Sequence, residues 1–110
     1  MTTATFNYLD GVFNNFVIEG HADYAEYGQD IVCSAVTTAT FQTIGLLQRF
    51  FPKSANYLEK EGYIELKMVQ AYNEIVNQEI VKQIIENFMD VLDNIKQQYP
   101  NNLKLIIARK

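Results

Sequence analysis

The sequence has few of the residues that build metal sites and covalent cross-links. Its 110 residues include one cysteine, Cys33, and one histidine, His21. A single cysteine excludes a disulfide within the chain and a metal site built from several thiolates. The sequence therefore predicts no structural metal.

Long apolar runs are also missing. No uninterrupted stretch approaches the roughly 18 apolar residues of a membrane span. The opening Met-Thr-Thr-Ala-Thr-Phe has neither the basic region nor the apolar stretch of a secretory signal. We therefore expect a cytoplasmic protein without a membrane partner. Hydrophobic residues make up 48% of the chain and charged residues 20%, as in ordinary globular proteins, and the length predicts a single domain over 1–110.

Basic residues are absent from the first 48 positions, since the first Lys or Arg is Arg49. Acids in the same stretch are Asp10, Glu19, Asp23, Glu26 and Asp30. Nucleic-acid binding normally needs a clustered basic face, so we expect no direct nucleic-acid contact. The acidic half favours a basic partner. The alternative is that these acids only keep a small protein soluble.

Alternating apolar residues predict four strands. The first, over 3–9, is joined to the second, over 12–19, by Asp10-Gly11, a pair typical of tight hairpin turns. Segments 63–70 and 103–108 have the same character, whereas 20–29 is interpreted as a loop and 52–62 as a polar connector.

Apolar residues at spacings of three and four predict two helices. Asp30 is the expected N-cap of the first, which ends at Phe51-Pro52, and Asn77 of the second, which ends at Tyr99-Pro100. The order ββαβαβ predicts a single-domain α+β fold, with a mixed or antiparallel sheet and two main helices packed on it. The apolar stripe of the second helix comprises Ile80, Ile84, Phe88, Val91, Leu92 and Ile95. Val81, Ile85 and Met89 widen it beyond one face, which implies two packing surfaces, one for the sheet and one for a partner.

The unique histidine and the unique cysteine flank one loop, which is bracketed by Gly20 and Gly28. Three residues after the expected cap, Cys33 would lie in the first helical turn, where free amides and the helix dipole stabilise a thiolate. A nearby imidazole from His21 would accept and donate the proton that a cysteine nucleophile requires. Taken alone, Cys33 is also explained as a small buried hydrophobe, and His21 as a loop residue with a local hydrogen bond.

Three blocks of this segment carry a family resemblance. They are Gly-His-Ala at 20–22, Glu-Tyr-Gly at 26–28 and Asp-Ile-Val-Cys-Ser-Ala-Val-Thr at 30–37. Their residues and their spacing closely resemble the signature of the ribosomal-processing cysteine proteases, the Prp family. The hairpin ahead of the signature and the late helix ending in Tyr99-Pro100 extend the resemblance over nearly the whole chain.

The resemblance implies a homodimeric cysteine endopeptidase without metal or organic cofactor. Members of the family remove the short N-terminal extension of large-subunit ribosomal protein twenty-seven, cutting after an aromatic residue. Carried across, His21 is the base and Cys33 the nucleophile, and Asp30 occupies the position of the family's aspartate. Thr37 stands where the family has serine, and Ser34 where it has alanine.

The loop between the two reactive residues is the expected substrate loop. Tyr24 and Tyr27 are predicted to wall a slot for the aromatic side chain, and Gly20 and Gly28 to act as hinges. Two other functions remain open at this point: a ribosome-associated protein that binds the extension without cutting it, and a dimer that senses redox conditions through Cys33.

Overall fold

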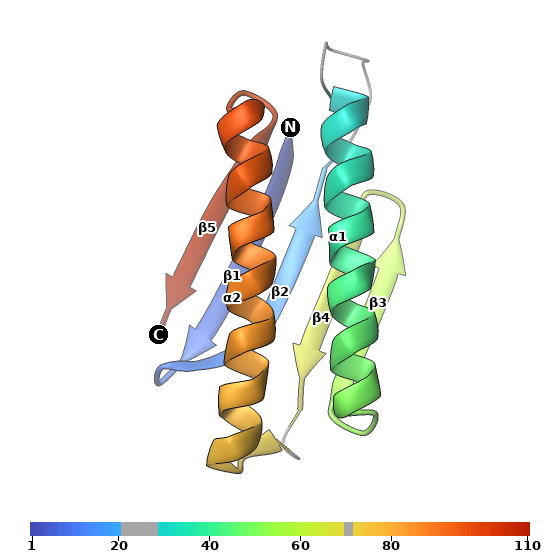
Figure 1. Ribbon diagram of the computed structural model, residues 1–110. Coiled ribbons are helices and arrows are strands. Elements are labelled where there is room, and N and C mark those ends of the chain that lie inside the picture. Colours follow the sequence, from blue (N-terminus) through green and yellow to red (C-terminus); the bar gives the residue numbers. More distant parts are fainter. Residues whose placement is uncertain (21–28, 70–71) are drawn as a thin grey trace.

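The computed structural model describes residues 1–20, 29–69 and 72–110. Two helices cover one face of a five-stranded sheet, α1 on the β4 side and α2 on the β1 side (Figure 1). The sheet order is β3-β4-β2-β1-β5, in which only β1 and β5 are parallel. The elements are β1 Thr2–Leu9, β2 Val12–Glu19, α1 Gln29–Phe50, β3 Ala55–Lys60, β4 Tyr63–Met68, α2 Ile75–Gln98 and β5 Leu103–Arg109. The expected α+β class, with a mixed sheet and two helices, is confirmed.

The first hairpin forms as expected. Asp10 and Gly11 have φ of 52° and 79°, the left-handed geometry of a two-residue hairpin turn. The β1–β2 register then shifts once, between Asn7 and Tyr8, so the strands pair with an irregularity near the turn.

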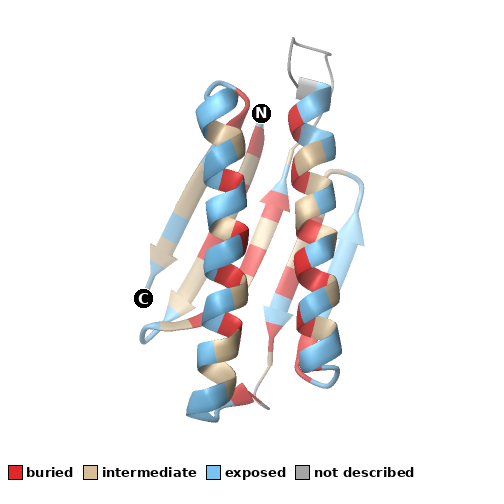
Figure 2. Ribbon diagram, viewed as in Figure 1, coloured by how far each residue is buried: buried red, intermediate tan, exposed pale blue. Residues whose placement is uncertain are grey.

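Three phenylalanines from three elements form the centre of the core. Phe6 of β1 and Phe16 of β2 lie opposite each other in the sheet with ring centroids 5.7 Å apart. Phe88 of α2 contacts both rings, at 5.6 and 5.1 Å. Around them lie buried residues of the two helices, and Figure 2 shows buried segments recurring along both helix ribbons. The apolar ones include Val32, Val36, Ile44 and Leu47 of α1, and Val81, Ile85, Phe88 and Leu92 of α2.

One strand was missed by the sequence prediction. The supposed polar connector over 52–62 contains β3, so the order is ββαββαβ. This strand lies at the sheet edge and only Ala55 of its six residues is buried. An edge strand that buries so little has no alternation of apolar and polar residues, which was the signal used to identify strands.

Both helix starts also differ from the prediction. Helix α1 begins at Gln29, so Asp30 lies in its first turn rather than at its N-cap. Helix α2 begins at Ile75 with Glu74 at the N-cap, and Asn77 lies inside the helix. Glu74 makes no side-chain capping bond, but its carbonyl accepts the Gln78 N–H at 3.0 Å. A start without a capping side chain leaves no signature in the sequence.

By length and composition, α1 is apolar enough over Asp30–Phe50 to cross a membrane. The core helix of a soluble protein passes the same test. The buried residues of α1 recur every three or four positions along the helix.

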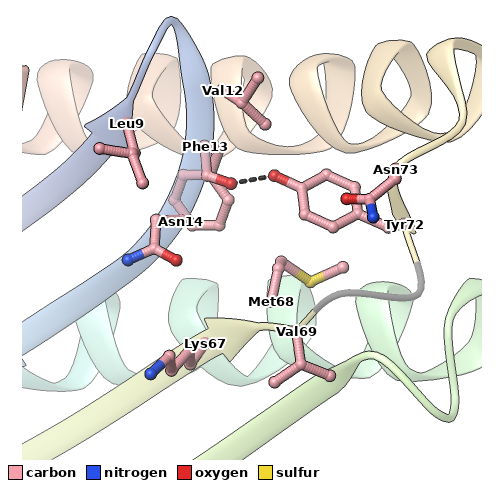
Figure 3. Close-up of a pocket in the computed structure, with 9 residues that line it drawn as sticks. All are labelled: Leu9, Val12, Phe13, Asn14, Lys67, Met68, Val69, Tyr72 and Asn73. Carbon is pink, nitrogen blue, oxygen red and sulfur yellow. Dashed lines mark hydrogen bonds between the residues drawn. The ribbon is translucent and has the colours of Figure 1, made fainter. Parts of the chain in front are cut away.

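Tyr72 fastens the segment after β4 to the first hairpin. It is buried, and its O–H donates a hydrogen bond to the carbonyl of Phe13 in β2 (Figure 3). Burial raises the pKa of Tyr72 to about 12, with the neighbouring Tyr8 contributing. The phenol therefore remains a donor throughout the physiological pH range.

Replacing this phenol tests the tether. Tyr72→Phe should lower the free energy of unfolding by about 1–3 kcal/mol, because the buried Phe13 carbonyl loses its partner. Urea denaturation at pH 7 measures the difference. Since the folded state holds the Tyr72 proton to about pH 12 while an unfolded tyrosine loses it near pH 10, this contribution should decline between those values. If the parent protein and Tyr72→Phe differ in unfolding free energy as much at pH 11.5 as at pH 7, the assignment is contradicted.

Candidate active site

Cys33 is an exposed side chain near the start of α1. Counted from Gln29 it is the fifth helical residue, so the free N–H groups of the first turn belong to residues 29–32. The prediction that Cys33 lies in the first turn is therefore wrong by one residue. The reason is the earlier start of the helix, which lengthens α1 by a residue ahead of Asp30.

A cavity of about 150 Å³ opens beside Cys33. Buried residues Ile18, Val36 and Ile64 provide apolar walls from β2, α1 and β4. Among the residues that the structure describes, the cavity is also lined by Thr2, Glu19, Gly20, Cys33, Thr37, Glu59, Lys60, Gly62 and Tyr63. The site thus lies where β2 ends, the β3–β4 hairpin turns and α1 begins.

The structure divides the predicted site residues of α1 between two surfaces. Cys33 and Thr37, one helical turn apart, both line the cavity. Asp30 and Ser34 instead line a groove of about 840 Å³ that reaches Val91 and Ile95 of α2. The supporting roles expected for Asp30 and Ser34 remain predictions.

Of the loop residues that the sequence singled out, the structure describes Gly20. His21, Tyr24, Tyr27 and Gly28 lie outside the described residues. Gly20, the residue before His21 in the sequence, lines the cavity together with Cys33, and its N–H donates to the Gly62 carbonyl at 3.1 Å.

Gly20 has a packing reason to lack a side chain. A Cβ atom there would lie 3.0 Å from both Cα and Oγ1 of Thr2 and 3.1 Å from the carbonyl oxygen of Met1. Contacts of 3.0–3.1 Å are tighter than nine in ten real Cβ contacts, so the start of β1 would have to move by a few tenths of an ångström. The glycine therefore permits close approach to the start of β1, a role that the sequence did not reveal.

Charged groups surround the Tyr63 ring, which lines the cavity. The ammonium of Lys60 lies 5.7 Å from the ring centroid of Tyr63, within cation–π range. Desolvation raises the pKa of Tyr63, and the carboxylates of Glu65 and Glu19 raise it further. The Tyr63 phenol is consequently neutral at physiological pH and available as a hydrogen-bond donor.

Sequence reasoning identified Thr37 but missed the apolar walls of this cavity. Val36 follows Cys33 by three positions, so helical spacing alone would have placed it beside the thiol. Ile18, Ile64 and Tyr63 come from strands whose proximity to Cys33 depends on the sheet order. No local signal links them to the thiol.

A second cavity, of about 720 Å³, lies at the other end of the sheet (Figure 3). Its walls come from the first hairpin, the end of β4 and Tyr72, and none of its described lining residues is a cysteine or histidine. Cys33, the predicted nucleophile, lines the smaller cavity instead.

Comparison with known proteins assigns the family. A model of the cysteine protease Prp family matches residues 1–104. The ribosomal processing cysteine protease Prp of Staphylococcus aureus strain Mu50 is 24% identical over 98 residues, covering 87% of this chain and 88% of that protein. The protein of the same name from Bacillus subtilis strain 168 is 28% identical over 93 residues, covering 83% and 82%.

Solved structures agree. SMU.848 from Streptococcus mutans superposes with a TM-score of 0.77 at 27% identity, covering 100% of this chain and 96% of that one. The S. aureus ribosomal processing protease Prp in complex with a substrate peptide reaches a TM-score of 0.83 at 22% identity, covering 98% and 100%, and supports the fold. The protein is a cysteine protease. It belongs to the Prp family, whose named relatives are ribosomal processing proteases.

A methyl group at position 20 tests whether close packing beside Cys33 matters for activity. Gly20→Ala should lower kcat/KM at least about tenfold, because Thr2 or the end of β2 must shift at the cavity wall. Gly45→Ala, where nothing lies within 4 Å of the added Cβ, is the matched control and should retain activity. Peptide cleavage kinetics and thermal melting of both variants measure the effect; equal activities would contradict it.

Proposed function

We propose that this protease acts in the cytoplasm and removes the short N-terminal extension of large-subunit ribosomal protein twenty-seven, cutting after an aromatic residue. The observation that carries the proposal is the exposed Cys33 thiol at an apolar-walled cavity that Gly20, the residue before His21, also lines. The names of the relatives, which describe ribosomal processing, support the substrate class.

The proposed mechanism is nucleophilic catalysis by a Cys33–His21 dyad. The imidazole of His21 accepts the Cys33 proton, and the thiolate sulfur forms a bond to the carbonyl carbon of the scissile peptide. When the carbon–nitrogen bond breaks, the imidazolium donates its proton to the leaving amine. Water then attacks the resulting thioester while His21 takes its proton, which frees the acid product and restores the thiol.

The cavity beside Cys33 supports an aromatic residue before the cut. A volume of about 150 Å³ is comparable to that of apolar cavities that hold a benzene ring in other proteins. Its walls Ile18, Val36 and Ile64 carry no charge and are buried. An aromatic ring has few polar groups that need a hydrogen-bond partner in such a cavity, and burying its apolar surface lowers its free energy relative to water.

Charge supports a basic protein as the substrate. The first 48 residues carry five acids and no basic residue, and two carboxylates, Glu19 and Glu59, lie at the cavity. Ribosomal proteins are usually basic, so the field favours their approach and their bound state. We propose the precursor protein, rather than nucleic acid, as the partner that this surface binds.

We also propose that the protease is a homodimer. The groove beside Asp30 and Ser34 exposes Ile31 and Val91, and Ile95 lines it from α2. These α2 residues lie outside the buried stripe of that helix, which comprises Val81, Ile85, Phe88 and Leu92. A second copy would cover the apolar surface that the sheet leaves open.

Single and double substitutions test the dyad. Cys33→Ala and His21→Ala should each lower kcat about a thousandfold or more, and the double variant should be no worse, because the two residues act as one unit. The assay is incubation with the precursor of ribosomal protein twenty-seven from the same organism, followed by product masses. The masses should place the cut after an aromatic residue.

The same assay separates the alternative functions. A protein that only binds the extension would retain the precursor without producing fragments. A redox sensor would change state with oxidant and would not depend on His21. Near-normal turnover by Cys33→Ala would contradict the dyad itself.

Sedimentation tests the dimer. At micromolar concentration the protein should sediment near twice 12.7 kDa, since an obligate interface buries more than about 2,000 Å² in total. Val91→Asp should shift it to the monomer, because a charge would then be buried in the interface. Ile107→Asp is the control: Ile107 is also partly exposed but belongs to β5 and does not line the groove. A monomeric parent protein would contradict the proposal.

A further inference from the structure

Strand β3 lies at an edge of the sheet, and two of its large apolar side chains are exposed to solvent. Within 1–20, 29–69 and 72–110 it pairs only with β4, and no other described strand lies on its far side. Tyr57 is 48% exposed and Leu58 47% exposed, and no charged residue occurs in β3 before Glu59. Edge strands of this kind are templates on which a further strand can pair.

The hydrogen bonds of β3 define which backbone groups are free. The Val69 N–H donates to the Ser54 carbonyl at 2.8 Å, so the pair Ser54–Val69 is a hydrogen-bonded one. In an antiparallel ladder such pairs alternate. In the observed register, Asn56, Leu58 and Lys60 therefore bond to β4. The N–H and C=O groups of Tyr57 and Glu59 point away from β4, along the open edge.

The side chains of the same two residues point toward α1. Tyr57 is paired with buried Leu66 and Glu59 with buried Ile64, which assigns both to the helix-covered face of the sheet. The Tyr57 ring meets Phe41 of α1 edge-on, with centroids 6.3 Å apart. Phe41 and Tyr57 together form an aromatic shelf at the open edge.

This edge leads to the nucleophile. On α1, Cys33, Thr37 and Phe41 are spaced by four residues and so lie along one flank of the helix. On β3, Glu59 and Lys60 line the same cavity as Cys33. A path between the helix flank and the strand edge therefore runs from the aromatic shelf to the reactive thiol. The other edge strand, β5, contributes no residue to that cavity.

We propose that the extended peptide substrate adds to β3 as a sixth strand, with backbone hydrogen bonds to Tyr57 and Glu59. One of its side chains rests on the aromatic shelf. Eight helical residues separate Cys33 from Phe41, a rise of about 12 Å, and an extended peptide covers that distance in about four residues. The shelf is thus a second specificity subsite, for an apolar or aromatic side chain about four residues from the scissile bond. This inference rests on the proposed function.

Methylated substrate peptides test the backbone pairing. In a series of peptides that span the cleavage site, one amide nitrogen at a time is methylated over four residues on each side of the cut. On the side that pairs with β3, kcat/KM should fall about tenfold at alternate residues and change less than about threefold between them, because only every second N–H faces the strand. Replacing the side chain about four residues from the cut by glycine should also lower kcat/KM.

Two proline variants test the enzyme's side of the contact. Tyr57→Pro removes an outward N–H without breaking a bond to β4. Ile107→Pro in β5 is the matched control, since that side chain is also 48% exposed. Its N–H also points outward. Toward β1, the Lys110 N–H donates to the Tyr8 carbonyl and the Asn102 carbonyl accepts from the Thr2 N–H. Because backbone groups alternate in direction along a strand, those of Ile107 point away from β1. Tyr57→Pro should lower kcat/KM for the long peptide about tenfold, whereas Ile107→Pro should not. Alkylation of Cys33 by iodoacetamide, which needs no peptide, should proceed equally in both variants.

The outcomes are distinguishable. No cleavage of any peptide by the parent protein would overturn the proposed function, and this assignment with it. Cleavage with a flat methylation series and equal activities of the two proline variants would overturn the β3 assignment alone. Conversion of a dimer to a monomer by Tyr57→Pro would assign the edge to a second copy, and would overturn the assignment as well.

Discussion

The structure depends on the packing of two helices against one face of a mixed sheet. Phe6, Phe16 and Phe88 join β1, β2 and α2 at the centre of that contact, with centroid distances of 5.1–5.7 Å. Because all the apolar faces meet in a single layer, the helices have little freedom to slide along the strands. The start of α1 is therefore held above the point where β2 ends and β4 begins.

That placement creates the site. A thiol on α1, three apolar residues from α1, β2 and β4, and the end of β3 meet around one small cavity. Each element has a separate structural reason to be there. Gly20 shows how tight the arrangement is, since an added Cβ would lie only 3.0–3.1 Å from the start of β1. The resulting cavity has apolar walls, with the carboxylates of Glu19 and Glu59 and the ammonium of Lys60 among its other lining groups.

Strong local patterns in the sequence predicted most of the fold. The first hairpin was predicted with its turn residues because Asp10 and Gly11 must adopt positive φ, which few other pairs do readily. The apolar positions of α2 were predicted because a 3.6-residue period is independent of neighbours. Which of them face the sheet was not predicted, since Val81 and Ile85 are buried whereas Val91 of the main stripe is exposed. Strand β3 and the start of α2 were missed, since their residues are largely exposed and their partners are distant in the sequence.

The sequence by itself determined the family, because a short signature that contains the single cysteine and the single histidine can be recognised from residue types and their spacing alone. It also determined the class of fold, through hydrophobic periodicity. Only the tertiary structure decided which residues surround Cys33. It separated Asp30 and Ser34 from the cavity that Thr37 lines, and it brought Ile18 and Ile64 to the thiol. The physical reason is that a helix fixes the flank on which a residue lies, whereas the order of strands in a sheet fixes what that flank meets.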